Sequence, residues 1–285
     1  MEKDIQKKVI NWYPGHMAKA MRLIKEKLNL VDVVIEVLDA RCPKSSLNPL
    51  LKETIKDKPL LLVINKIDLA DEKVTKEWYT ELSKEYSVVL VDSLNGSKNV
   101  EIILNALELL LKDKITRANE KGINIYPIKA MVVGIPNSGK STFMNNLAKR
   151  KALEVGNRPG GTKNQQYLKV SDKIILLDNP GVLWPKFEDQ NEALILALSG
   201  SIKDDVVDLS EIARFGLELI YNNYPELLKE RFKIESFSDD VIEAIARKRG
   251  CIIKGGEIDY PKTYDLIIRE IRLGKIGRIS FERPN

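Results

Sequence analysis

The sequence predicts an α/β protein, with a mostly parallel sheet flanked by helices and a smaller all-α C-terminal domain. Short apolar runs rich in Val, Ile and Leu alternate with helix-like stretches up to residue 181. Runs that are apolar along their whole length are typical of strands buried on both faces. Strands that alternate with helices favour a parallel sheet with helices on either side. After residue 181 the pattern becomes almost entirely helical.

Each expected strand ends where polar residues gather. The strands are expected at residues 31–38, 59–64, 88–91, 128–133 and 174–177. Helices are expected between them at residues 18–28, 73–85, 100–115 and 142–149. Because parallel strands end at one edge of a sheet, where α/β proteins bind ligands, the polar clusters are expected to form one site.

The C-terminal part is expected to contain helices and one strand-like run. The helices are expected at residues 188–198, 209–222, 239–249 and 261–273, and the strand-like run at 278–281. This change of pattern predicts two domains, one of residues 1–185 and a helical one of residues 186–285.

The composition excludes several classes of protein. With 44% hydrophobic and 31% charged residues, the 285-residue chain is neither collagen-like nor largely disordered. No apolar run approaches the roughly 18 residues of a membrane helix, and the N-terminus lacks a signal-peptide pattern, so a cytoplasmic location is expected. Two cysteines cannot build a disulfide framework or a zinc module. The net charge of +5, with basic residues crowded near both ends, hints at an anionic partner.

A phosphate-binding loop is the most specific motif. Residues 134–141, GIPNSGKS, match the pattern GxxxxGK[ST] and lie between an expected strand and an expected helix. Backbone N–H groups of such a loop converge on phosphate oxygens, its lysine reaches the β- and γ-phosphates, and its serine holds Mg²⁺. The residues expected to contact nucleotide here are Asn137, Ser138, Gly139, Lys140, Ser141 and Thr142.

Two further segments are expected to complete the phosphate site. Asp178 ends a strand within the sequence DNPG, where a carboxylate directed at Mg²⁺ belongs, and the Gly181 N–H is expected near the γ-phosphate. Thr162, within Gly-Gly-Thr, offers a hydroxyl on a loop between these elements. The expected Mg²⁺ ligands are therefore Ser141, Thr162 and Asp178.

The sequence NKID at 65–68 favours guanine as the base. The Asp68 carboxylate can accept both the N1–H and the N2 amino group of guanine, whereas adenine presents it with one amino donor and a lone pair. Asn65 and Lys66 belong to the same motif, and Ser93 is expected to bring a backbone N–H to guanine O6. An ATP-using P-loop enzyme is the alternative, and competition between nucleotides separates the two.

The order of these motifs is rotated relative to ordinary GTPases, because NKID precedes the phosphate loop. The chain thus resembles the circularly permuted GTPases, and specifically the YlqF/RbgA ribosome-assembly family. The resemblance covers nearly the whole chain and lies in the segments WYPGHMAKA (12–20), DARCPKSSLNP (39–49), NKID, GIPNSGKST, GGTK, DNPGV and RKRGCIIKGGEID (247–259). It implies a monomeric GTPase that binds GTP and GDP, is stimulated by the ribosome, and assists assembly of the large (50S) subunit through rRNA and ribosomal proteins. The alternative is a GTP-regulated adaptor for protein partners.

The resemblance also implies roles for single residues. Val182 stands where many GTPases have a glutamine that orients the attacking water, and His16 matches the family's catalytic histidine, although a lone histidine is otherwise more often structural. Asn137 resembles an asparagine that holds K⁺ in some GTPases, although asparagine is equally good as a turn former. The helical domain is implied to contact rRNA, and its expected RNA-binding residues are Arg247, Lys248, Arg249, Lys254, Arg272, Lys275 and Arg278.

Overall fold

The computed structural model describes residues 15–92, 96–148, 167–185, 187, 189–234 and 240–284. They form two compact units, one of residues 15–184 together with 282–284 and one of residues 185–281. Among the described residues, no helix combines the length and apolar character needed to cross a bilayer.

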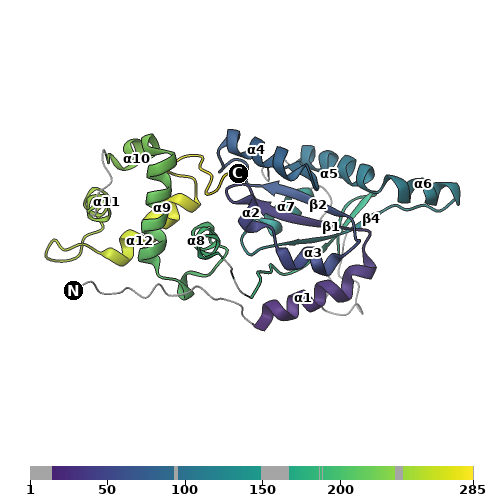
Figure 1. Ribbon diagram of the computed structural model, residues 1–285, viewed down its shortest axis with the longest axis horizontal. Coiled ribbons are helices and arrows are strands. Elements are labelled where there is room, and N and C mark those ends of the chain that lie inside the picture. The colour runs from purple at the N-terminus through teal and green to yellow at the C-terminus, as the bar shows by residue number, and fades with distance from the viewer. Residues whose placement is uncertain are drawn as a thin grey trace. The chain divides into compact units, whose positions relative to one another are not determined.

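The first unit is built on a six-stranded sheet of order β3-β2-β1-β4-β6-β5 (Figure 1). All neighbouring pairs are parallel except β5 with β6. The five expected strands are present, as β1 (Val33–Asp39), β2 (Leu60–Asn65), β3 (Ser87–Leu90), β4 (Ile128–Gly134) and β6 (Ile174–Asp178). The sixth strand, β5 (Tyr167–Ser171), was not expected, because this edge strand buries only Val170 and has no continuous apolar run.

Helices cover both faces of this sheet (Figure 1). Alternate residues of β1 point to opposite faces: Val33, Ile35 and Val37 join the core beneath α5 and α7, while Val34 joins the core beneath α1 and α3. A third core, built around Leu38 and the β2 residues beside it, packs under α4. The helices are α1 (Gly15–Lys27), α2 (Pro43–Ser46), α3 (Pro49–Ile55), α4 (Glu72–Leu82), α5 (Gly96–Leu110), α6 (Lys112–Glu120) and α7 (Lys140–Ala148).

Side-chain caps explain where several of these helices begin. Asn48 precedes Pro49 and accepts the Leu50 N–H, which starts α3, and Asp71 accepts two N–H groups at the start of α4. The helix expected over 100–115 is instead two helices, α5 and α6, separated at Leu111. α6 buries none of its residues, and Ile115 is its only large apolar residue, so its sequence has no second apolar run that would mark a separate element.

The second unit is helical. It contains α8 (Gln190–Ser199), α9 (Leu209–Asn223), α10 (Pro225–Phe232), α11 (Val241–Arg249) and α12 (Tyr260–Arg272). Its core includes Ile212 and Leu217 from α9 and Ile267 and Ile271 from α12. The expectation of a strand at 278–281 was wrong: these residues form no strand, because the described part of the unit offers no neighbouring strand to pair with them.

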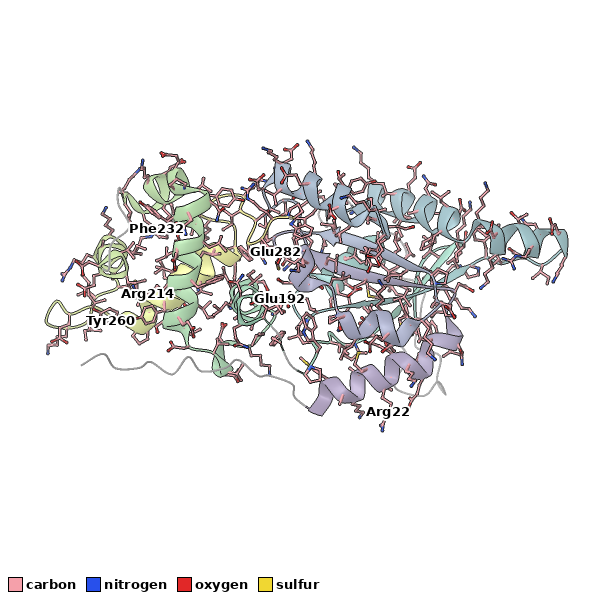
Figure 2. All side chains as sticks on the ribbon, in the orientation of Figure 1. Arg22, Glu192, Arg214, Phe232, Tyr260 and Glu282 are labelled. Carbon is pink, nitrogen blue, oxygen red and sulfur yellow. The ribbon has the colours of Figure 1, made fainter. Side chains whose placement is uncertain are left out.

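The last described residues return to the first unit. The Glu282 carboxylate accepts hydrogen bonds from the Ser45 backbone N–H, at 3.0 Å, and from the Ser45 hydroxyl. The Glu282 carbonyl accepts the Trp78 Nε1–H at 3.2 Å. Glu282 is labelled in Figure 2. The first unit is therefore completed by residues from the far end of the chain.

A buried carboxyl lies in the middle of β1. Glu36 is 1% exposed, and its Oε1 accepts the Asn48 backbone N–H at 2.9 Å. Burial raises the pKa of Glu36 to about 8, and the hydrogen bond from Asn48 offsets part of this increase. Glu36 is therefore mostly protonated in the folded protein at pH 7.

Glu36→Gln is expected to flatten the dependence of stability on pH. The pKa of Glu36 is 4.5 in the unfolded chain and about 8 in the folded protein. The unfolded chain releases this proton at a lower pH, so the contribution of Glu36 to the free energy of unfolding falls as pH rises from 4.5 to 8. In urea unfolding, the free energy of unfolding of the variant relative to that of the wild type should increase by about 3 kcal/mol between pH 5 and pH 8. A constant difference between the two proteins would contradict the buried, protonated Glu36.

Candidate functional site

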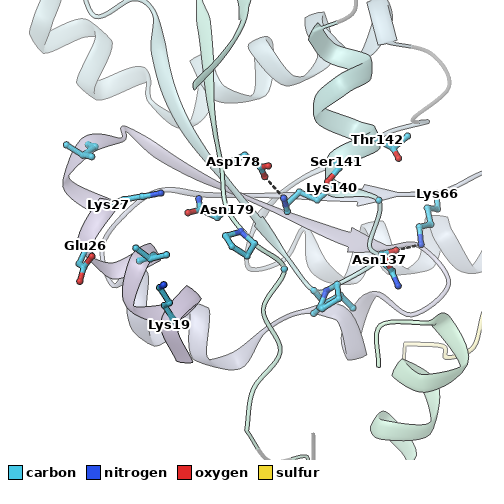
Figure 3. A pocket seen from close by; sticks show the side chains of 17 residues that line it. Lys19, Glu26, Lys27, Lys66, Asn137, Lys140, Ser141, Thr142, Asp178 and Asn179 are labelled. Atoms are coloured by element: carbon cyan, nitrogen blue, oxygen red, sulfur yellow. Dashed lines mark hydrogen bonds and ion pairs between the residues drawn. The ribbon is translucent and has the colours of Figure 1, made fainter. Parts of the chain in front are cut away.

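A cleft of about 1120 Å³ opens in the first unit beside the carboxyl ends of β4 and β6 (Figure 3). Its walls come from four separate segments: α1 and the turn after it, Lys66 after β2, the loop after β4 with the start of α7, and the loop after β6. Lys19 and Lys27 of α1 face the cleft, whereas Arg22 of the same helix points outward (Figure 2). The polar clusters at the ends of β4 and β6 therefore meet in one cavity.

The phosphate-binding loop joins β4 to α7 and is supported from β2. The Asn65 side-chain amide donates to the Ser138 carbonyl at 3.0 Å, and both residues are fully buried. Gly139 has a φ of +88°, and a Cβ there would lie 2.4 Å from Asn65 Nδ2. Only glycine satisfies this turn and this close approach. Asn65 thus holds the loop in shape from the neighbouring segment.

Lys66 links the same loop to β1. Its Nζ donates to the Asn137 carbonyl and to the Asp39 carboxylate, the latter at 2.8 Å. Arg41 donates to Asp39 through Nε at 3.0 Å and through a terminal nitrogen at 2.8 Å. Although burial favours the neutral acid, Arg41 and Lys66 hold the pKa of Asp39 well below its usual range.

Asp39 and Arg41 were not among the expected site residues. Both side chains are 1% exposed, so their charges are compensated inside the protein rather than by water. The available signal was the position of Asp39 and Arg41 at the end of an expected strand, at the edge where the other polar clusters lie. Together they fix Lys66 over the phosphate loop.

The expected phosphate and metal ligands are neighbours in the cleft. Lys140 forms an ion pair with Asp178, and Ser141 and Thr142 line the cavity at the start of α7 (Figure 3). Hydroxyl and carboxylate oxygens are ligands that Mg²⁺ prefers, so Ser141 and Asp178 fit such an ion. Ser138, by contrast, is a fully buried residue of the loop.

The segment after Asp178 is held tightly against the phosphate loop. A Cβ on Gly181 would lie 2.9 Å from the Pro136 backbone. The Val182 N–H donates to the Gly134 carbonyl at 3.0 Å, and the Val182 side chain is 3% exposed within the core beneath α1 and α3. Val182 therefore cannot orient a water molecule in the cleft.

Four other expected site residues lie either outside the cleft or, in whole or in part, outside the described part of the protein. Asp68 is exposed, follows β2, and does not line the cleft. His16 lies in the first turn of α1, but its side chain is outside the described part of the protein. Ser93 and Thr162 are outside the described residues altogether.

The basic residues of the helical unit divide into two groups. Arg249 pairs with Glu270 and stacks on Phe232, and Arg272 bonds to Asp204 and to the carbonyls of Ala197 and Leu198. These two arginines stabilise the unit itself. The exposed members of the expected RNA-binding set are Arg247, Lys248, Lys254, Lys275 and Arg278.

Comparisons with known proteins agree with the nucleotide site. A family model described as 50S ribosome-binding GTPase matches residues 129–229. Ribosome biogenesis GTPase A of Bacillus cereus is 46% identical over 279 residues, which cover 97% of this chain and 94% of that protein. The Thermotoga maritima protein of the same name is 34% identical, covering 96% of this chain and 95% of its own. The crystal structure of GNP-bound YlqF from T. maritima has a TM-score of 0.66 and 30% identity, covering 94% of this chain and 99% of that one.

Proposed function

Because this chain belongs to the ribosome biogenesis GTPase A family, we propose that it binds the large (50S) ribosomal subunit during assembly and hydrolyses GTP there, stimulated by the ribosome. The chain is a GTPase. The observation that most supports the proposed site is the contact of Asn65 and Lys66 with the phosphate loop, which joins the base-recognition motif to the phosphate-recognition motif.

Within the cleft, we assign the triphosphate to the loop after β4. Backbone N–H groups of the loop and of the start of α7 bind phosphate oxygens, and Lys140 binds the β- and γ-phosphates. Ser141 and Asp178, together with Thr162, hold Mg²⁺, which neutralises charge on the phosphates when bound. The Gly181 N–H binds the γ-phosphate.

The guanine base is assigned to the end of β2. Asp68, exposed after this strand, accepts the two N–H donors of guanine, and the Ser93 backbone donates to O6. Since this motif precedes the phosphate loop in the chain, we propose that the domain is a circularly permuted GTPase domain. We assign this domain to residues 1–185.

Hydrolysis requires a group that positions the attacking water. The burial of Val182 excludes this residue, which supports His16 as the catalytic group, since α1 lines the same cleft. His16 is the only histidine of the chain. Its imidazole would orient the water beside the γ-phosphate.

A bound K⁺ is proposed beside the phosphates. Asn137 lines the cleft, and its amide oxygen is a suitable ligand for a hard cation (Figure 3). Its φ of +59° shows that it also serves the turn, a conformation that asparagine tolerates. The two roles are compatible.

The helical unit is proposed to bind rRNA through its exposed basic residues. Arg247, Lys254 and Lys275 are exposed, and their side chains form no hydrogen bond or ion pair with another described residue. We also propose that the protein contacts ribosomal proteins, is located in the cytoplasm and is a monomer. Phosphate contacts of this kind make binding strongly dependent on salt.

Turnover of GTP with and without purified large subunits tests this function. Large subunits are expected to raise turnover at least tenfold, whereas small subunits at the same concentration leave it unchanged. Equal turnover under the three conditions would refute stimulation by the large subunit.

His16→Ala is expected to retain GTP binding and to lose most of the ribosome-stimulated turnover. Loss of a group that orients the attacking water is expected to lower the rate by about 10²-fold or more. Nucleotide titration and single-turnover assays measure the two properties separately. Stimulated turnover like that of the wild type would reject His16 as the catalytic residue.

Turnover is expected to be faster in KCl than in NaCl at equal ionic strength. Asn137→Gly removes the amide but keeps the positive φ, because glycine adopts this conformation readily. The variant should therefore lose the difference between the two salts while its turnover in NaCl stays the same. Comparable rates of the wild type in both salts would rule out the K⁺ site.

Replacing Arg247, Lys254 and Lys275 together by Gln is expected to weaken binding to large subunits and to lower its dependence on salt. The slope of log affinity against log salt should fall by about 2 to 3 units. A matched control replaces three exposed lysines of the first unit, Lys73, Lys112 and Lys121, whose side chains likewise form no ion pair with another described residue. An unchanged slope in the helical-unit variant would favour an adaptor for protein partners.

A further inference from the structure

Asn48 connects the core of the first unit to the segment that follows Asp178. It lies between α2 and α3, is 4% exposed, and uses all four of its polar groups in hydrogen bonds, its carbonyl accepting the Leu51 N–H at 3.1 Å. Its backbone N–H donates to Glu36 at 2.9 Å, and its side-chain oxygen accepts the Leu50 N–H at 3.0 Å. Its side-chain amide donates to the Val182 carbonyl at 3.1 Å, across 134 residues of sequence.

Val182 is therefore held through both of its backbone polar groups. Its N–H is bound to the Gly134 carbonyl, at the start of the phosphate loop, and its carbonyl is bound to Asn48. Its side chain is buried in the core that contains Val34 and Met131. Gly181, one residue earlier, lies so close to Pro136 that an added Cβ would be 2.9 Å from the Pro136 backbone.

The position of the Gly181 N–H depends on this attachment. The planar peptide group between Gly181 and Val182 contains the Gly181 Cα and carbonyl, so fixing both polar groups of Val182 holds the Cα from which the Gly181 N–H extends. Asn48 itself is anchored at one end by Glu36 in the centre of β1 and at the other by the start of α3. The contact with Val182 thus ties the segment to a rigid part of the sheet.

We propose that Asn48 is a positioning residue for recognition of the γ-phosphate, acting through Val182 on the Gly181 N–H. The inference rests on the proposed nucleotide site, in which this N–H binds the γ-phosphate. GDP lacks that phosphate, so Asn48 contributes to the binding of GTP and not to that of GDP. Asn48 does not line the cleft.

Asn48→Ser isolates the contact with Val182. Serine is a good N-cap, so it retains the acceptor for Leu50, but its short side chain lacks the amide that reaches Val182. The variant should bind GDP within twofold of the wild type and bind a non-hydrolysable GTP analogue about tenfold more weakly, the size expected for weakening one hydrogen bond to a charged group. Calorimetric titration with each nucleotide gives the ratio of GTP-analogue affinity to GDP affinity.

Asp71→Ser is the matched control, because it changes another N-cap of the same unit that has no contact with the cleft. Its ratio of GTP-analogue affinity to GDP affinity should equal that of the wild type. A wild-type ratio in Asn48→Ser would overturn the inference, and so would an equal loss of both nucleotides, which would mean that Asn48 only supports the fold. Failure of the wild type to bind either nucleotide would instead refute the nucleotide site.

Discussion

The contact between the end of β2 and the phosphate loop is the interaction on which the rest of the site depends. The two segments lie on strands separated in the sheet by β1, yet Asn65 and Lys66 both donate hydrogen bonds to carbonyls of the loop. With these carbonyls bound from the end of β2, the loop N–H groups remain available for phosphate. Without such support the buried Ser138 carbonyl would lack a partner.

The ion cluster beneath Lys66 explains how a lysine can take this position. A lysine amine fixed against a buried surface requires a compensating negative charge, and Asp39 supplies it from the strand between the two motifs. Asp39 is in turn held by two guanidinium hydrogen bonds from Arg41, so its orientation is set before Lys66 binds it. The strand between the two nucleotide motifs thus contributes the residues that join them.

Residues near the C-terminus give the first unit a second set of long-range contacts. Glu282 binds Ser45 in α2, a few residues after Asp39 and Arg41, and its carbonyl binds Trp78 of α4. The Ser46 hydroxyl meanwhile accepts the Asp39 N–H at 3.1 Å. Neighbouring serines of one short helix therefore contact Glu282 and Asp39, so a residue from the far end of the chain lies close to the ion cluster of the first unit.

The sequence by itself determined the parallel sheet and the phosphate loop, because both are encoded locally. Strands buried on both faces need continuous apolar runs, and the loop needs glycines at fixed spacing before a lysine and a serine. The edge strand β5, the break at Leu111 and the lack of a strand at 278–281 could not be predicted in this way, since each depends on what lies beside the segment. Only the tertiary structure decided that Asp39 neutralises Lys66 and that Asn48 holds Val182. Such polar contacts join residues far apart in the chain, and their energy comes from burial and mutual geometry, which no local pattern records.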